Sequence, residues 1–257
     1  MQVAEVRPNP GKSLSDEHLG FVESGEAEAL DARQILIWGM ENFAPELSLS
    51  CSFGAPEGLV VLDMMHRIDA ASRVFTIDTG RLPQATHDLV DRVRDRYAKR
   101  VEVLFPREGD VREMTEAHGS NLFYESVSRR QHCCRVRKVE PLRRYLATQR
   151  AWVTGLRRDQ GVTRSELRKI EIDHANGGLV KLNPIADWTH ERVMEYVRSH
   201  DVPVNRLHGA GYPSIGCEPC SRAVAPDADP RSGRWWWEKP ETRECGIHVE
   251  EEQGSGI

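Results

Sequence analysis

The sequence predicts an α/β fold, in which helices cover both faces of a mostly parallel sheet. Two observations support this prediction. Short runs rich in Val, Ile and Leu alternate along the chain with longer segments whose apolar residues recur at helical spacing. Such alternation is typical of parallel sheets, because each helix returns the chain to the edge where the next strand begins. With 257 residues, the chain is also long enough to bury one substantial core.

The first half of the chain begins with a leader and continues with alternating helices and strands. Residues 1–25 are mostly polar and predict a flexible leader. The next helix should end before Pro45, since proline interrupts a helix. The expected elements are a helix over 26–43, a strand and a Ser/Gly loop over 47–58, a helix over 59–68, a strand over 73–80, a helix over 84–99 and a strand over 100–106.

The second half is first helical, then mixed, and finally irregular. Residues 111–149 are mostly helical by composition, and Pro141 marks a break or a helix start within them. A strand with a polar loop is expected over 151–158. A strand and then a helix capped by Thr189 are expected over 179–202. Glycine and proline become frequent after that helix, so we expect little regular structure there.

Composition limits both the compartment and the partners of the protein. No apolar run approaches the roughly 18–20 residues of a membrane helix, and the N-terminus lacks a secretory signal, so we expect a cytoplasmic protein with no membrane partner. The net charge of -5 argues against a nucleic acid partner. We expect one domain over 26–230, between the leader and a mobile C-terminal tail over 231–257.

Positive charge is concentrated in three short stretches of this acidic chain. They read "RRQHCCRVRK", "GLRRDQGVTR" and "RSGRWWW". Such islands are sufficient to bind a small anionic ligand, although each is equally compatible with a solvated helix or loop face.

Three loops that follow predicted strands carry groups suited to an anionic ligand. In an open parallel sheet, ligands bind beyond the carboxyl ends of the strands, so these loops should meet at one edge. Hydroxyls, close backbone approach and guanidinium groups can all bind phosphate or sulfate oxygens. The candidate residues are Ser50, Ser52 and Gly54 in the first loop, Asp78 and Thr79 in the second, and Arg157, Arg158 and Arg164 in the third. The first loop is not a Walker A motif, and it lacks the acidic residue of loops that split ATP to pyrophosphate.

Four of the six cysteines form two pairs that predict a metal centre. Cys133 and Cys134 are adjacent, and Cys217 and Cys220 form a Cys-x-x-Cys pair. These thiols suit either zinc or an iron-sulfur cluster. Adjacent residues rarely direct both sulfurs to one ion, whereas a [4Fe-4S] cluster offers a separate iron to each thiolate, so the cluster is favoured.

The remaining two cysteines have different predicted roles. Cys51 lies in a predicted strand and is expected to be a small buried residue. Cys245 lies in the tail between Arg243 and His248, and nearby positive charge lowers the pKa of a thiol. Cys245 is therefore either a nucleophile or an incidental surface cysteine.

Together these motifs resemble the assimilatory sulfonucleotide reductases, in particular the adenylylsulfate (APS) reductase type with a [4Fe-4S] cluster. The resemblance covers about residues 28–250, and its most specific parts are "CC" followed by "RKVEPL", then "CEPC", "GRWWWE" and "ECGIH". It implies a Rossmann-like fold of the adenine nucleotide alpha-hydrolase type. It also implies reduction of APS to sulfite and AMP, in which Cys245 forms an S-sulfonate that thioredoxin or a similar dithiol then releases as sulfite.

The resemblance also implies a role for individual residues. Cys245 would be the catalytic nucleophile, and Cys133, Cys134, Cys217 and Cys220 would hold a cluster that does not change its redox state. Lys138 could link that cluster to the substrate. The implied substrate-binding residues are Ser52, Phe53, Gly54, Ile77, Thr79, Lys138, Gly155, Arg164, Arg231, Arg234 and His248.

Several alternatives remain open at the level of sequence. The "SFG" form of the first loop also occurs in enzymes of the phosphoadenylylsulfate (PAPS) type, so a PAPS-preferring or dual-specificity reductase is the main rival. A tRNA-thiolating enzyme would need a pyrophosphate-splitting loop and a basic surface. A non-enzymatic iron-sulfur or zinc module would leave Cys245 without a role. Residues 235–237, three tryptophans, are either a substrate wall or an anchor for the tail, and a homo-oligomer is compatible with the sequence.

Overall fold

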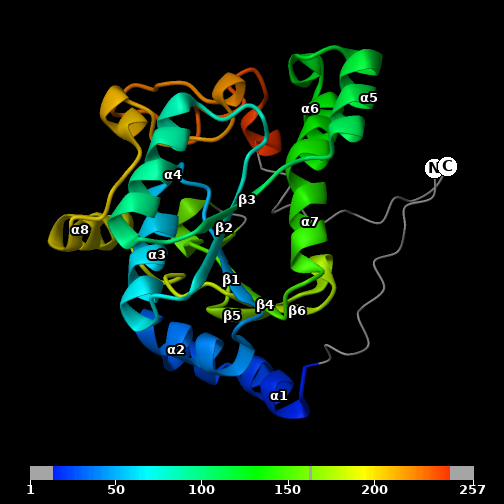
Figure 1. Cartoon of the computed structure of the whole chain (residues 1–257). Coiled ribbons are helices and arrows are strands. Elements are labelled where there is room, and N and C mark those ends of the chain that lie inside the picture. Colours follow the sequence, from blue (N-terminus) through cyan, green and yellow to red (C-terminus); the bar gives the residue numbers. More distant parts are fainter. Residues whose placement is uncertain (1–13, 162–163, 244–257) are drawn as a thin grey trace.

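The computed structural model describes residues 14–161 and 164–243, and its centre is one six-stranded sheet (Figure 1). The strands are β1 (Leu47–Ser50), β2 (Arg73–Ile77), β3 (Val101–Leu104), β4 (Ala151–Val153), β5 (Ile170–Asp173) and β6 (Leu179–Leu182). Their order across the sheet is β3-β2-β1-β4-β6-β5. All neighbours run parallel except β5, which pairs antiparallel with β6. The predicted mostly parallel sheet is therefore confirmed.

Eight α-helices pack around this sheet in the described part of the chain. They are α1 (Asp16–Ser24), α2 (Ala32–Phe43), α3 (Pro56–Ile68), α4 (Gln84–Tyr97), α5 (Glu108–His118), α6 (Val127–Cys134), α7 (Glu140–Leu146) and α8 (His190–His200). None of these helices has both the length and the apolar composition required to cross a bilayer. Helix α8 is capped by the Thr189 side chain as predicted, through the N–H of Arg192.

Helices cover both faces of the sheet, as the sequence predicted. On one face, Leu49, Val74 and Val153 join the main core with residues of α2, α3 and α4. The opposite face presents Phe75 and Trp152, which pack with Leu142 and Leu146 of α7. Figure 1 shows α3 and α4 on one side of the strands and α7 on the other. Successive residues of a strand point to opposite faces of the sheet, so neighbouring residues such as Val74 and Phe75 pack into different hydrophobic clusters.

The predicted leader contains a helix that the sequence analysis did not predict. Helix α1 occupies residues 16–24, and the Ser15 side chain caps it by accepting from the N–H of His18 at 3.2 Å. Val22 is buried in the main core, and Phe21 packs against that core. The expectation of a loose leader up to residue 25 was therefore wrong for α1, because its few apolar residues gain their partners only in the folded protein.

The structure contains a second unpredicted element, and several predicted boundaries are shifted: the helix expected over 26–43 begins at Ala32, and the strand expected over 73–80 ends at Ile77. The edge strand β5 was missed because its two isoleucines stand among charged residues. Helix α3 begins at Pro56 rather than at residue 59, and proline at this position is compatible with a helix start.

A π-helical turn, Arg135–Val139, joins α6 to α7. Within it, the N–H of Glu140 donates to the carbonyl of Arg135, five residues earlier. Pro141 has no N–H to donate, and its ring would crowd the carbonyl four residues before it in a regular helix. The wider turn accommodates this proline. Pro141 marks a helix start, which is one of the two outcomes that the sequence predicted.

Candidate active site

The three loops predicted to bind an anion meet at the carboxyl edge of the sheet. They follow β1, β2 and β4, and these three strands are neighbours in the order β2-β1-β4. The chain adds β2 and β3 on one side of β1 and β4 on the other, so the edge beyond β1 is the point where the strand order reverses. This is where open α/β sheets bind their ligands.

The loop after β1 is held in a constrained shape. Phe53 is fully buried with a left-handed φ of 54°, and its carbonyl accepts from the Asn205 side-chain amide at 3.0 Å. The hydroxyl of Ser52 accepts from the N–H of Gly54 at 3.4 Å. A Cβ on Gly54 would lie 2.4 Å from the carbonyl oxygen of Ile215. Glycine is therefore required here, because two backbone segments touch.

The loop after β4 also packs by close backbone approach. A Cβ on Gly155 would lie 2.8 Å from the N of Gly58 and 2.9 Å from the carbonyl carbon of Glu57, both in the first turn of α3. Gly155 thus brings this loop against the start of α3, where free N–H groups can bind an anion.

Two arginines of this third loop are paired within the protein. The buried Arg157 guanidinium donates to the Glu57 carboxylate, with an Nη2–Oε1 distance of 2.8 Å. Arg158 pairs with Glu28 at 2.6 Å. Arg164 donates from Nη1 to the Gln160 side chain at 2.5 Å. The predicted phosphate contacts of Arg157 and Arg158 are therefore replaced by carboxylates of the protein itself.

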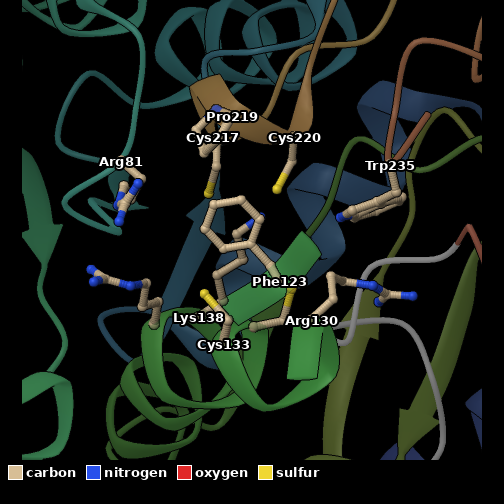
Figure 2. Close-up of a pocket in the computed structure, with 11 residues that line it drawn as sticks. Arg81, Phe123, Arg130, Cys133, Lys138, Cys217, Pro219, Cys220 and Trp235 are labelled. Atoms are coloured by element: carbon tan, nitrogen blue, oxygen red, sulfur yellow. The ribbon is translucent and has the colours of Figure 1, made fainter. Parts of the chain in front are cut away.

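Four cysteines from two distant segments line one cavity beside this edge. Cys133 and Cys134 are the last two residues of α6. Cys217 directly precedes the short 3-10 helix η8 (Glu218–Cys220), and Cys220 is its last residue. Figure 2 shows Cys217 and Cys220 facing Cys133 across the cavity, with Arg81 on one side of the thiols and Arg130 and Trp235 on the other. The cavity is lined by Arg81, Phe123, Arg130, Cys133, Cys134, Arg137, Lys138, Cys217, Pro219, Cys220 and Trp235.

Hydrogen bonds to main-chain groups of the Cys-x-x-Cys segment hold it in place. The N–H of Glu218 donates to the Arg81 carbonyl at 2.8 Å. The Tyr124 hydroxyl donates to the Pro219 carbonyl at 3.1 Å. Arg234 Nε donates to the Cys220 carbonyl at 3.1 Å. These contacts connect the segment to the loop after β2, to the residues before α6, and to the C-terminal part of the chain.

Thr79 connects the carboxyl edge of the sheet to the thiols. Its hydroxyl lies 3.2 Å from the Sγ of Cys217 and accepts from the N–H of Arg81 at 3.2 Å. Its carbonyl accepts from Arg137 Nη1 at 2.7 Å. A residue predicted from its loop position is thus also a neighbour of a predicted metal ligand.

Burial and nearby cations oppose each other in setting the pKa of these thiols. Burial raises the pKa of Cys220 to about 12. Burial also raises the pKa of Cys217, but Lys138, the Thr79 hydroxyl, Arg234 and Arg137 together lower it below its ordinary value. The cavity therefore combines exclusion of water with positive charge, a setting that favours a bound anionic group.

The donor set can be compared with the needs of different metals. Among the described residues, no group of three or more His, Cys, Asp or Glu side chains is arranged to hold a metal ion. The five described cysteines are free thiols, four of which line the walls of the cavity. A single zinc ion would need four sulfurs at about 2.3 Å from one point. Thiols spread around a cavity fit a larger group bound through several iron atoms better.

The C-terminal part of the chain packs against this cavity. Trp235 is 1% exposed and clusters with Phe123, Cys217 and Cys220. Trp237 stacks edge-on against Tyr124, with ring centroids 4.5 Å apart, whereas Trp236 is 39% exposed. Trp235 and Trp237 therefore anchor the chain, which was one of the two predicted roles.

The other predicted site residues occupy different parts of this region. Ile77 ends β2 and packs partly against the core under α7. Lys138 lines the thiol cavity. Arg231 donates from Nη2 to the Arg243 carbonyl at 3.0 Å. Cys245 and His248 lie outside the described residues.

Sequence reasoning missed three cavity cations, Arg81, Arg130 and Arg137. Arg81 lies in the second predicted loop, two residues after Thr79, and Arg137 precedes Lys138, so proximity to predicted residues was the available signal. Arg130 and Arg137 lie in the basic stretch "RRQHCCRVRK", which indicated an anion site without assigning either residue, and the partners of Arg130 lie more than 100 residues away.

These features define an α/β protein with a nucleotide-type sheet edge next to a cavity of four thiols. Residues 46–223 match the model of the phosphoadenosine phosphosulfate reductase domain, and the chain belongs to this family. It is 51% identical over 200 residues to the adenosine 5'-phosphosulfate reductase of Allochromatium vinosum, covering 78% of this chain and 77% of that protein. It is 53% identical over 176 residues to the protein of the same name from Burkholderia cepacia, covering 68% and 70%.

A solved structure supports the same family assignment. The chain superimposes on phosphoadenylyl-sulfate (PAPS) reductase from Candida auris, solved as a phosphate complex, with a TM-score of 0.68 and 29% identity. The match covers 82% of this chain and 98% of the other. The adenine nucleotide alpha-hydrolase-like fold that the sequence predicted is confirmed.

Proposed function

We propose that this protein reduces APS to sulfite and AMP in sulfate assimilation. The observation that carries the proposal is the convergence of four thiols, Thr79 and Lys138 beside the nucleotide edge of the sheet. The relatives named adenosine 5'-phosphosulfate reductase support the choice of substrate. The reaction consumes two electrons, which must come from a thiol reductant because neither APS nor water supplies them.

In the first step, the Cys245 thiolate attacks the sulfate sulfur of APS. An S–S bond forms, the bond from sulfur to the bridging phosphate oxygen breaks, and AMP leaves with the electron pair. Both reactants are anions, so cations must offset their repulsion and the charge that develops on the phosphate. We assign this role to Lys138, Arg164, Arg231 and Arg234, with His248 beside the nucleophile. Arg81 and Arg137 add positive charge at the cavity wall.

In the second step, a thiolate of thioredoxin or a similar dithiol protein attacks the Cys245 sulfur. The S–S bond to the sulfonate breaks and sulfite leaves. The second thiol of the reductant then resolves the mixed disulfide and regenerates Cys245, so the reductant ends as a disulfide. This chemistry requires a reducing compartment, and we propose the cytoplasm.

We propose that Cys133, Cys134, Cys217 and Cys220 hold a [4Fe-4S] cluster. Their arrangement around a cavity supports this assignment, and the cations at its wall suit a group that four thiolates make anionic. When bound, the cluster supplies a fixed electrostatic field near the substrate without exchanging electrons with it. Lys138 follows the first cysteine pair and is proposed to bind the substrate beside this group.

The nucleotide is proposed to lie along the carboxyl edge of β2, β1 and β4. Ser52, Phe53 and Gly54 present a constrained loop, and Gly155 keeps the neighbouring loop against α3. Ile77 and Thr79 complete this edge. The proposed organisation is a nucleotide-binding domain over 26–230 followed by a C-terminal segment that carries the nucleophile.

The test is intact-protein mass spectrometry of anaerobically purified enzyme after incubation with APS and no reductant. We expect a mass increase of one sulfonate on the wild-type protein and none on Cys245→Ser, while the brown chromophore and AMP binding persist in the variant. Thioredoxin should remove the adduct. No adduct with either APS or PAPS would overturn the proposal.

A second candidate is a reductase that prefers PAPS. The structural similarity to a solved PAPS reductase and the "SFG" loop favour this alternative. The same experiment with PAPS separates the two, since labelling by PAPS alone would reverse the substrate assignment.

A further inference from the structure

The described end of the chain is fastened to α6 by one buried ion pair. Arg130 lies on α6, three residues before Cys133, and is 1% exposed. Its Nε and Nη2 donate to the two carboxylate oxygens of Glu238, both at 2.9 Å. Its Nη2 also donates to the carbonyl of Thr242 at 2.7 Å. One guanidinium group therefore binds two points of the C-terminal segment.

Glu238 organises the residues that follow it. Its Oε2 accepts from the Thr242 hydroxyl at 3.0 Å, and its carbonyl accepts from Arg243 Nε at 3.0 Å and Nη2 at 2.7 Å. The Arg130 guanidinium also lies over the Trp235 ring, 4.9 Å from its centroid. We call these five residues, Arg130, Trp235, Glu238, Thr242 and Arg243, the latch.

Stability alone is a weak explanation for the buried pair in this latch. Removing two charges from water costs free energy that their attraction often fails to recover, and apolar replacements are often equally stable. The fork geometry instead fixes distance and direction. An arginine guanidinium stays charged in proteins, and here both carboxylate oxygens of Glu238 pair with it.

We infer that Arg130 is a positioning residue that fixes the place of residues 238–243, directly before Cys245 in the sequence. The inference rests on the proposed function, which makes Cys245 the nucleophile. Cys245 follows Arg243 by two residues, and two extended residues span at most about 7 Å. Because α6 also carries Cys133 and Cys134, one helix positions the thiol cavity and the starting point of the nucleophile segment.

The main test replaces the pair by apolar residues of similar length, in the variant Arg130→Met/Glu238→Met. Replacing both partners avoids an unpaired buried charge. We expect AMP affinity and the chromophore to be kept within about twofold, whereas the single-turnover rate of S-sulfonate formation falls about 10- to 100-fold, as for other small misplacements of reacting groups. A wild-type rate in this variant would overturn the inference.

A control removes a more exposed ion pair where β2 begins, at the end of the strand opposite the site. Arg73 donates from Nε at 3.1 Å and from Nη2 at 2.8 Å to one carboxylate oxygen of Glu102, and 35% and 28% of the two side chains are exposed, so this pair controls for loss of an ion pair elsewhere in the fold. Arg73→Met/Glu102→Met should keep the wild-type rate of adduct formation. An equal loss in this control would show that the effect is general, and would overturn the specific role of Arg130.

A second variant covers the case in which the double replacement fails to fold. Arg130→Lys keeps the buried charge but cannot reach both Glu238 oxygens and the Thr242 carbonyl together. We expect a slower adduct formation with an intact chromophore. A wild-type rate in Arg130→Lys would again overturn the inference.

Hydrogen exchange supplies a readout that does not depend on catalysis. The N–H groups of Glu238 and Thr242 donate within the segment, to Trp235 and Lys239. In the Met/Met and Lys variants, peptides covering 235–243 should exchange at least about tenfold faster, while peptides from the sheet stay unchanged. Unchanged exchange over 235–243 would refute the latch. A wild-type enzyme that forms no adduct would instead refute the proposed function.

Discussion

Cys51 and Cys217 show how much the surroundings of a thiol decide its chemistry. Both are buried near the carboxyl edge of the sheet. Burial raises the pKa of Cys51 to about 12. At Cys217 the same effect of burial is exceeded by Lys138 and the Thr79 hydroxyl, which lower the pKa. The prediction that Cys51 is a small buried residue is confirmed, and burial is the main cause of its high pKa.

Cys51 is therefore expected to resist alkylation in the native enzyme. With a pKa of about 12, the thiolate fraction at pH 8 is about one in ten thousand, and burial also blocks the reagent. We expect iodoacetamide at pH 8 to leave Cys51 unmodified until the protein is unfolded, as measured by peptide mass spectrometry. Cys51→Ala should keep sulfite formation within about twofold. Rapid labelling of Cys51 in the native protein would contradict this account.

Other residue roles could not be predicted because they depend on partners far along the chain. The sequence shows that residues 157 and 158 are arginines in a loop after a strand. It does not show that their guanidinium groups pair with the carboxylates of Glu57 and Glu28 instead of a phosphate. The same is true of Arg130 and Glu238, which are 108 residues apart. By contrast, Gly54 and the hydroxyls of the first two loops could be singled out because they follow predicted strands, although the contacts of Gly54 with Ile215 and of Thr79 with Cys217 could not be predicted.

At the scale of elements, contact between backbone segments determines the shape of the carboxyl edge of the sheet, where the nucleotide is proposed to bind. The loop after β4 touches the first turn of α3 through Gly155, and the loop after β1 touches Ile215 through Gly54. Side chains at these contacts would separate the loops from the helix N-terminus. The sheet and the order of its helices could be read from apolar periodicity, whereas α1 and β5 could not, because their apolar residues are few.

Gly155→Ala should weaken both nucleotide binding and folding. The added Cβ would meet backbone atoms at 2.8 and 2.9 Å, which cannot move without shifting α3. We expect a loss of about 1–3 kcal/mol in the free energy of unfolding, and a weaker affinity for AMP. Urea unfolding and calorimetric titration with AMP measure these two quantities.

Gly109→Ala in α5 is the matched control. Apart from its chain neighbours and the backbone of its own helix, no described atom lies within 4 Å of the position of its Cβ, and alanine favours a helix over glycine, so stability should stay equal or rise by about 0.5–1 kcal/mol. Equal behaviour of the two variants would show that the contact at Gly155 does not shape the site.

At the scale of the whole molecule, the site depends on segments that the sheet brings together from both ends of the chain. The two cysteine pairs are separated by more than 80 residues, yet the sequence identified both because their spacing is specific. That they share one cavity is a property of the fold.

Asp63 of α3 joins three helices of the main core. Its side chain is buried, and the residue is 1% exposed. Tyr97 of α4 donates to its Oδ1 at 3.0 Å, and Tyr196 of α8 and Arg67 of α3 donate to its Oδ2 at 2.8 and 2.6 Å.

Asp63 should make the stability of the fold depend on pH in the acidic range. Burial raises the pKa of this carboxyl, but hydrogen bonds from Arg67, Tyr196 and Tyr97 lower it below its ordinary value. A carboxyl with a lowered pKa in the folded state adds stability above its unfolded pKa, about 3.9, and loses this contribution as the pH falls through the folded value. Asp63→Asn cannot titrate and should lower the free energy of unfolding by about 2–3 kcal/mol at pH 7.

This loss can be measured by urea unfolding under anaerobic conditions, followed by circular dichroism. The difference in the free energy of unfolding between wild type and variant should be the same at pH 7 and pH 5, and smaller below about pH 4. A difference that already shrinks between pH 7 and pH 5 would mean that the pKa of Asp63 is raised, and that its burial outweighs the three donors that join α3, α4 and α8.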